Sequence, residues 1–209
     1  MNILIADDHA VVRRGLKDIL ADEFEMLHTS EACNAQETLE AARKQEWDIA
    51  LLDIKMPGRS GLEVLEELKK LHPKMPVVML SAFPEEDYAL RAFKLGAAGY
   101  VSKESASDEL FTAIRKALAG GRYVTSSLAE KLAATLSGDS PLTPHELLSN
   151  RELEVLRLIA AGKTIKETAG ELSLSEKTVA TYRLRISKKM GLSTNVELTR
   201  YALQHKLVD

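Results

Sequence analysis

Five short strand-like runs, each followed by a helical pattern, constrain the fold of this 209-residue chain more than any other feature. The runs cover residues 2–6, 26–31, 48–52, 77–80 and 99–101, and the helical patterns cover 10–20, 35–44, 61–71, 85–95 and 106–119. The apolar run that ends at Asp53 is too short for a buried helix and is typical of a strand buried on both faces. The alternation predicts an α/β domain with a five-stranded parallel sheet covered by helices on both faces.

Acidic residues stand where two of these strands end. Asp7 and Asp8 follow the first run, and Asp53 closes the third. Open α/β sheets place their ligands at the carboxyl ends of the strands, so we expect these carboxylates to share one edge. They suggest a site for a hard cation, and Asp53 is placed to accept a phosphoryl group there.

Two further residues complete the expected site. Ser81 follows the fourth strand and Lys103 follows the fifth. Carboxylates suit Mg²⁺, which prefers oxygen ligands; a lysine can neutralise phosphoryl oxygens, and a carboxylate can act as the nucleophile. Taken singly, Asp7 or Asp8 could cap the helix near Ala10, Ser81 could be a turn residue, and Lys103 a solvated charge. The five groups together favour a phosphoryl site.

These residues resemble the receiver domain of bacterial two-component response regulators. The resemblance is carried by Asp7-Asp8-His9, Asp53-Ile54-Lys55-Met56-Pro57-Gly58, Ser81-Ala82 and Gly99-Tyr100-Val101-Ser102-Lys103. It implies a flavodoxin-like fold over about the first 120 residues, with Asp53 as phosphoacceptor. It further implies that Mg²⁺ is held by Asp8, Asp53 and the backbone carbonyl of Lys55, with Asp7 assisting. Ser81 and Lys103 would sense the phosphoryl group, and Tyr100 would be the switch aromatic.

The chain changes character after Gly120-Gly121. One short amphipathic helix is expected over 126–136, followed by the linker sequence Ser137-Gly138-Asp139-Ser140-Pro141. We therefore expect a receiver at residues 1–121, a linker with a short helix at 122–147 and a second domain at 148–209. From Ser149 onward the chain has 11 Lys and Arg against 7 Asp and Glu, a charge of +4, which leaves −7 for the rest because the whole is −3.

The second domain is expected to contain only helices. Ser149 and Glu152 form a capping-box pattern before the first helix, and a second helix is expected over 165–172. Ser175 precedes a third helix over 176–190, and a fourth covers 196–204. Two short helices joined by a tight turn are the outline of a helix-turn-helix, whose second helix enters the major groove of DNA.

The third helix has two different faces at 100° per residue. Val179, Tyr182, Ile186 and Met190 fall on one side and should pack on the domain. The opposite side and its flanks carry the expected DNA-binding residues: Lys177, Ala180, Thr181, Leu184, Arg185 and Lys188. Five basic residues against one acid between 176 and 189 suit phosphate contacts. Small and apolar groups beside them suit base edges or thymine methyl groups.

This segment resembles the LuxR/FixJ-type helix-turn-helix. The resemblance is carried by Leu148-Ser149, Arg151-Glu152, Glu154-Val155-Leu156, Ala161-Gly162-Lys163, Leu174-Ser175, Lys177-Thr178-Val179 and Lys188-Lys189-Met190. With the receiver it implies a NarL/FixJ-type two-component response regulator. Ala180 stands where that family often has a basic or polar residue, and Tyr182 where it often has histidine. The run 178–183 and the run 196–198 are similar to the GacA/UvrY branch.

The resemblance implies a phosphorylation-dependent transcription regulator that is not an enzyme. Its partners would be a sensor histidine kinase and double-stranded DNA, with a homodimer forming on phosphorylation. Two alternatives come from the residues: a Mg²⁺-dependent aspartyl phosphatase, or a receiver that controls a protein or RNA partner. Phosphatases of this type often carry a second acid two residues after the nucleophile, and Lys55 occupies that position.

The compartment is expected to be the cytoplasm. The single cysteine, Cys33, cannot form an internal disulfide, which fits a reducing compartment. No apolar stretch approaches the roughly 20 residues that span a bilayer, and no basic and apolar leader precedes the first strand. We therefore expect no membrane partner.

Overall fold

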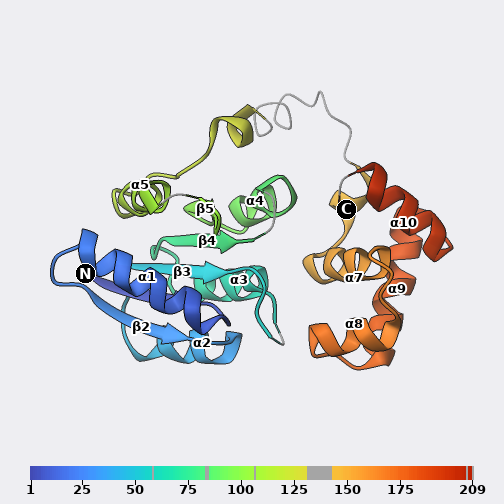
Figure 1. The fold of residues 1–209 in the computed structure, drawn as a ribbon, viewed down its shortest axis with the longest axis horizontal. Coiled ribbons are helices and arrows are strands. Elements are labelled where there is room, and N and C mark those ends of the chain that lie inside the picture. The colour runs from blue at the N-terminus through green and yellow to red at the C-terminus, as the bar shows by residue number, and fades with distance from the viewer. Residues whose placement is uncertain (58, 83–84, 106, 131–142, 206, 209) are drawn as a thin grey trace. The chain divides into compact units, whose positions relative to one another are not determined.

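A computed structural model describes residues 1–209 except 58, 83–84, 106, 131–142, 206 and 209 (Figure 1). The chain divides into two compact units, Met1–Ser137 and Gly138–Asp209. Gly58, the expected helix start at Ala106, most of the expected helix over 126–136 and the expected linker sequence 137–141 lie outside the described residues.

The first unit has the expected alternation of strands and helices. Its strands are β1 (Asn2–Ala6), β2 (His28–Ala32), β3 (Ile49–Asp53), β4 (Val77–Ser81) and β5 (Gly99–Ser102), and its helices are α1 (Ala10–Glu23), α2 (Ala35–Lys44), α3 (Gly61–Leu71), α4 (Glu85–Lys94) and α5 (Ser107–Leu118). All strand pairs are parallel, in the order β2-β1-β3-β4-β5. The α/β prediction is therefore confirmed.

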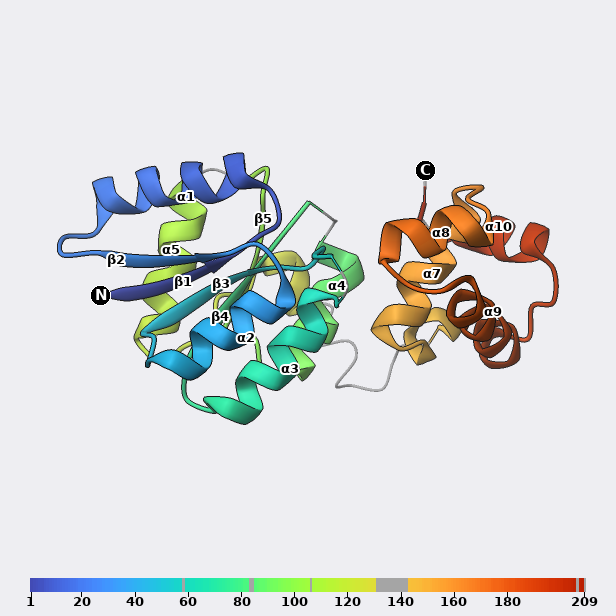
Figure 2. The ribbon, with the colours of Figure 1, turned by 90° about the horizontal axis from the view of Figure 1, so that it is seen from below.

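Helices cover both faces of the sheet, with α1 and α5 on one side and α2, α3 and α4 on the other (Figure 2). The core between the sheet and the α1/α5 layer consists largely of fully buried aliphatic side chains, among them Ile5, Leu20, Leu51, Val78 and Ile114. Both β3 and β4 are buried along their whole length. That burial explains why their sequences lack the alternation of a half-exposed strand.

The element boundaries differ from the sequence prediction at a few places. The second strand begins at His28 rather than Met26, because Met26 has a left-handed backbone (φ 51°) and a side chain that is 90% exposed. At their carboxyl ends, β3 and β4 are longer than predicted and extend to Asp53 and Ser81. The site residues at these positions therefore belong to the strands themselves, where the ladder restrains their backbone.

The segment after α5 pairs with β5, the outermost strand on one side of the sheet. The Tyr123 amide donates a hydrogen bond to the Ala98 carbonyl at 2.8 Å, and Tyr123 forms an isolated parallel bridge with Gly99 of β5. A side chain at Gly99 would press on Tyr123, since an added Cβ would lie 3.3 Å from the Tyr123 Cβ. Helical backbone is described again over 126–130, where Leu128 is buried.

The second unit is helical, as predicted. A 3₁₀ turn, η1 (Pro144–Leu147), precedes α7 (Asn150–Ala160), α8 (Ile165–Leu172), α9 (Glu176–Met190) and α10 (Asn195–Gln204). The helices enclose a small core that includes Leu156, Val179, Ile186 and Leu198, all fully buried. Capping boxes begin α7, α8 and α10, and caps of this kind typically contribute about 1 kcal/mol each.

Candidate functional site

The acidic residues meet at the carboxyl ends of β1 and β3, the neighbouring strands between which the strand order reverses. Asp7 directly follows β1 and is fully buried, and Asp53 is the last residue of β3 and is 2% exposed. Asp8, the next residue, is partly exposed, with 27% of its side chain accessible. In an open α/β sheet this reversal opens the crevice in which ligands bind. The prediction that the carboxylates share one edge is confirmed.

Lys103 joins the two buried carboxylates. Its Nζ lies 2.6 Å from Asp7 Oδ2 and 2.8 Å from Asp53 Oδ2, and its side chain is 15% exposed. The Lys103 amide also donates to the Ser81 carbonyl at 2.8 Å, which holds the loop after β5 against the end of β4. Lys103 is therefore not a solvated loop charge but the cation of a buried cluster.

The charges of this cluster are strongly coupled. Burial raises the pKa of the Asp53 carboxyl to about 6, and the nearby Asp7 charge acts in the same direction. The Lys103 ammonium and the Lys55 amide, which hydrogen-bond to Asp53, offset part of this rise. Burial alone would lower the pKa of Lys103, but its bonds to Asp53 and Asp7 outweigh burial and raise the pKa overall. Lys103 therefore stays charged at neutral pH.

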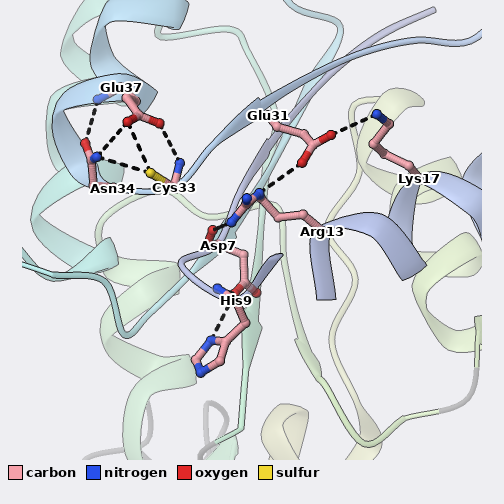
Figure 3. A network of polar contacts seen from close by, with 8 residues as sticks. All are labelled: Asp7, His9, Arg13, Lys17, Glu31, Cys33, Asn34 and Glu37. Atoms are coloured by element: carbon pink, nitrogen blue, oxygen red, sulfur yellow. Dashed lines mark hydrogen bonds and ion pairs between the residues drawn. The ribbon is translucent and has the colours of Figure 1, made fainter. Parts of the chain in front are cut away.

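His9 belongs to the same cluster, which the sequence reasoning missed. Its Nδ1 lies 2.7 Å from Asp8 Oδ1. Figure 3 shows His9 beside Asp7, where Nδ1 lies 3.2 Å from Asp7 Oδ1 and the His9 amide donates to the same oxygen at 2.8 Å. His9 is also the N-cap of α1 and makes no side-chain cap bond, so neither Asp7 nor Asp8 caps that helix. Only the adjacency of His9 to the acid pair could have indicated its position.

The donor set fits a divalent cation that prefers oxygen. One ligand atom from each of Asp7, Asp8, His9 and Asp53 can be chosen so that all lie within 4.8 Å of one another. Ligands on opposite sides of one Mg²⁺ are about 4.2 Å apart, close to this spread. Among the described residues, one lysine, Lys103, is shared by the buried Asp7 and Asp53 carboxylates, so a bound cation would add positive charge to balance the pair.

Ser81 and Tyr100 lie beside this cluster in the sheet. Ser81 is fully buried at the end of β4 and pairs with Ser102 of β5. Tyr100 is 2% exposed and pairs with Met79. Lys55, two residues after Asp53, is exposed. The structure thus places the expected receiver residues at one edge, with the switch candidate Tyr100 two positions before Ser102, the last residue of β5.

The other candidate site is the outer face of α9. Lys177, Ala180, Thr181, Leu184, Arg185 and Lys188 are all exposed, and Leu184 is 57% exposed despite being apolar. The opposite face packs inward as predicted, with Val179, Ile186 and Met190 buried and Tyr182 partly so. Ser175 is the N-cap of α9, and its hydroxyl accepts from the Thr178 amide at 3.1 Å; Gly191, with a left-handed backbone (φ 68°), is the C-cap.

The five basic residues of α9 divide into two groups. Arg183 donates to Asn195, Ser187 and the Ser193 carbonyl, and Lys189 Nζ lies 2.6 Å from Glu152 Oε2. These two side chains therefore fasten α9 to the rest of its domain. No ion pair joins Lys177, Arg185 or Lys188 to another described residue, and all three residues are exposed, although the Arg185 guanidinium carbon lies 5.9 Å from the centre of the Tyr182 ring. Counting charges in the sequence could not separate the two groups.

Comparison with known proteins identifies the family of each domain. The response regulator receiver domain matches residues 3–115, and the luxR family of bacterial regulatory proteins matches residues 146–202. The response regulator GacA of Pseudomonas viridiflava is 37% identical over 212 residues, covering 100% of this chain and 98% of that protein. UvrY of Escherichia coli strain K12 is 34% identical over 208 residues, covering 99% and 95%.

The chain belongs to the response regulators.

Solved structures with the same fold include the Salmonella typhimurium response regulator RcsB, with a TM-score of 0.72 at 26% identity over 98% of this chain and 97% of that one. RcsB bound to promoter rprA in the presence of phosphomimetic BeF₃⁻ gives a TM-score of 0.66 at 25% identity, covering 96% and 97%. This response regulator therefore carries a receiver and a LuxR-type DNA-binding domain of the transcription-regulating type, as the sequence resemblance implied. Within its described residues, no helix is both long and apolar enough to cross a membrane.

Proposed function

We propose that phosphorylation of Asp53 by a sensor histidine kinase controls how this response regulator binds promoter DNA. The observation that carries the proposal is the Lys103 ammonium between the buried Asp7 and Asp53 carboxylates, at 2.6 and 2.8 Å. This arrangement supplies a nucleophilic carboxylate with a fixed cation beside the position that a phosphoryl group would occupy. Lys55 in the position of a second acid argues against a phosphatase.

The side chains at this edge have separate tasks in the transfer. A carboxylate oxygen of Asp53 attacks phosphorus, and the bond from phosphorus to the donor's leaving atom breaks, which leaves an acyl phosphate. Lys103 then pairs with a phosphoryl oxygen, and the Ser81 hydroxyl donates a hydrogen bond to another. The group adds about two negative charges, so it draws Ser81 and Lys103 toward it and reorients Tyr100.

The metal site belongs to the same proposal. Asp8, Asp53 and the Lys55 carbonyl would hold Mg²⁺, with Asp7 assisting, and the ion would neutralise charge on the transferring group. The close group of carboxylate oxygens supports this assignment. The raised pKa of Asp53 means that protons compete for this carboxylate below about pH 6.

The remaining assignments follow from the two-domain organisation. We assign residues 1–121 to the receiver, 122–147 to the linker and 148–209 to the DNA-binding domain. Phosphorylation favours a homodimer, which presents two copies of α9 to half-sites about one helical turn apart. The protein acts in the cytoplasm, where its DNA target lies, and turns over no substrate. Lys177, Arg185 and Lys188 contact phosphates, while Ala180, Thr181 and Leu184 face base edges.

Footprinting on DNA from the source genome tests this function directly. We expect the purified protein to protect discrete duplex sites, and acetyl phosphate with Mg²⁺ to raise its affinity for them about 5- to 150-fold, the usual range of coupling between two sites. The measurement is a titration of protection with and without the phosphodonor. Equal affinity in both conditions would contradict the phosphorylation control, and protection of single-stranded RNA alone would favour the RNA alternative.

Two neighbouring lysines test which side of α9 meets DNA. The Lys188→Gln variant should bind all duplex sequences more weakly and reduce the slope of log affinity against log salt by about 0.9 per protomer, because one phosphate contact is lost. The matched control is Lys189→Gln, which removes the cation beside buried Glu152 and should destabilise the domain by roughly 1–3 kcal/mol without changing the salt slope. A slope lowered equally by both substitutions would refute the division of this helix into two faces.

A further inference from the structure

The peptide bond between Asp7 and Asp8 is held by a side chain from α1. Arg13 Nη1 donates to the Asp7 carbonyl at 2.7 Å, and only 14% of the Arg13 side chain is exposed (Figure 3). On the other side, the Asp7 amide donates to the Ala32 carbonyl at 3.1 Å. Asp7 is therefore fixed at both of its backbone polar groups, one by the sheet and one by Arg13.

Arg13 is itself held in place by Glu31 of β2. Arg13 Nε lies 3.0 Å from Glu31 Oε2, and Lys17 Nζ lies 2.8 Å from Glu31 Oε1 (Figure 3). Hydrogen bonds from Lys17 and Arg13 lower the pKa of Glu31, so it is charged at neutral pH. A planar guanidinium presents its donors in a fixed fork, so the bond to Glu31 sets the direction of the bond to the Asp7 carbonyl.

This contact bears on the direction of the Asp8 carboxylate. The Asp7 carbonyl belongs to the peptide plane that enters Asp8, and that plane restricts where the Asp8 side chain leaves the backbone. Asp8 is partly exposed, and the ionic contact of its carboxylate among the described residues is with His9, whose side chain is 62% exposed. Within the described part of the chain, the Asp8 carboxylate makes no other hydrogen bond or ion pair, so we expect the backbone contact of Arg13 to have a large share in its orientation.

We propose that Arg13, oriented by Glu31, is a positioning residue that holds the Asp7–Asp8 peptide in the geometry required for Mg²⁺ binding. The inference rests on the proposed function of this edge, and it adds two residues outside the carboxylate cluster to the metal site. In this role Arg13 would contact neither the ion nor the phosphoryl group. Outer groups that orient metal ligands typically contribute 10- to 100-fold in affinity.

The direction in which Mg²⁺ affinity changes when Arg13 is removed separates a positioning role from electrostatic repulsion alone. Arg13 is a cation near a cation site, so repulsion alone predicts that its removal tightens Mg²⁺ binding. Positioning predicts the opposite, because a mobile Asp8 must be ordered when the ion binds. A role limited to attaching α1 to the sheet would change thermal stability and leave the affinity of the folded protein for Mg²⁺ unchanged.

The experiment is calorimetric titration of the full-length protein with MgCl₂ at constant ionic strength. We expect Arg13→Gln to weaken Mg²⁺ binding about 10-fold, and Arg13→Lys, which can still donate to the Asp7 carbonyl, to recover most of the loss. The control Lys17→Gln removes the other partner of Glu31 without touching Asp7 and should bind as the wild type does. If Arg13→Gln does not fold, Glu31→Gln replaces it, with an expected weakening of about 3-fold.

The outcomes distinguish this inference from the function on which it rests. If the wild type binds Mg²⁺ and Arg13→Gln binds it equally or more tightly, the positioning role is overturned and the proposed function stays intact. Equal weakening in Lys17→Gln also overturns it, because the effect would then belong to the charge network as a whole. A wild-type protein that binds no Mg²⁺ overturns both.

Discussion

Replacing Asp53 with asparagine is expected to abolish phosphorylation of the protein and, with it, the effect of a phosphodonor on DNA binding. Asparagine keeps the shape of the side chain but offers no carboxylate oxygen to attack phosphorus. Intact-mass spectrometry after incubation with acetyl phosphate and Mg²⁺ should show one added phosphoryl group on the wild type and none on Asp53→Asn. Chelation of Mg²⁺ should prevent the addition to the wild type.

The footprinting titration completes this test. Asp53→Asn should protect the same sites as the unphosphorylated wild type, with an affinity that acetyl phosphate does not change. A variant that gains a phosphoryl group elsewhere and still responds in DNA affinity would show that Asp53 is not the residue through which the signal enters. The unphosphorylated wild type is the matched control, because it differs only at the nucleophile.

Asp53→Asn should also change how the folding stability depends on pH. Because the pKa of Asp53 lies at about 6 in the folded protein and its ordinary value is 3.8, the folded state binds this proton more tightly than the unfolded chain does. The stability of the metal-free wild type should therefore fall relative to Asp53→Asn as pH rises from about 4 to about 7, and level off above that. The fluorescence of Trp47, the one tryptophan of the chain, follows unfolding of its domain. A constant difference across this pH range would contradict the burial argument.

Replacing Gly61 with alanine should lower the free energy of unfolding more than the other substitutions proposed above. Gly61 begins α3 soon after β3, the strand that ends at Asp53, and its amide donates to the Ile54 carbonyl at 2.7 Å. A Cβ added here would lie 1.9 Å from the backbone oxygen of Asp53 and 2.9 Å from the Ile54 Cα. Backbone atoms cannot rotate aside as a side chain can, so either α3 or the end of β3 must move.

We expect Gly61→Ala to cost about 3 kcal/mol or more in unfolding free energy and to weaken Mg²⁺ binding, because the displaced segment carries Asp53. Urea unfolding followed by Trp47 fluorescence measures the first effect. The control is Gly15→Ala in the exposed part of α1, where an added Cβ meets no atom within 4 Å. That control should gain about 0.5–1 kcal/mol, since alanine is the better helix former. Equal stabilities of the two variants would refute the close approach of α3 to Asp53.

The sequence predicted the main elements because strand burial and helix caps leave local patterns. The run before Asp53 and the capping pattern from Ser149 to Glu152 are examples, and both elements formed as expected. The placement of Asp7, Asp53 and Lys103 at one edge followed from the parallel order of the strands. These predictions used only the polarity and spacing of neighbouring residues.

Other features depend on contacts between distant segments and had no local pattern. The bond from Arg13 to Glu31 crosses 18 positions in sequence, and the bond from Lys189 to Glu152 crosses 37. The start of β2 was misplaced because the left-handed turn at Met26 is made by a residue that rarely adopts it. The receiver motifs indicate the residues that are proposed to react, while the bonds around them depend on tertiary packing.

The division of α9 has a consequence for how such regulators diverge. Arg183 and Lys189 are committed to the fold, so selection for a stable domain constrains them whatever DNA the protein reads. Ala180, Leu184 and Lys188 are exposed and are not constrained in this way. Substitutions at exposed positions usually change stability by no more than about 0.5 kcal/mol. With the DNA contacts proposed above, a duplicated copy of this gene could therefore acquire a new operator through a few changes on one side of a single helix, while its folding and the acidic cluster of its receiver remain as they are.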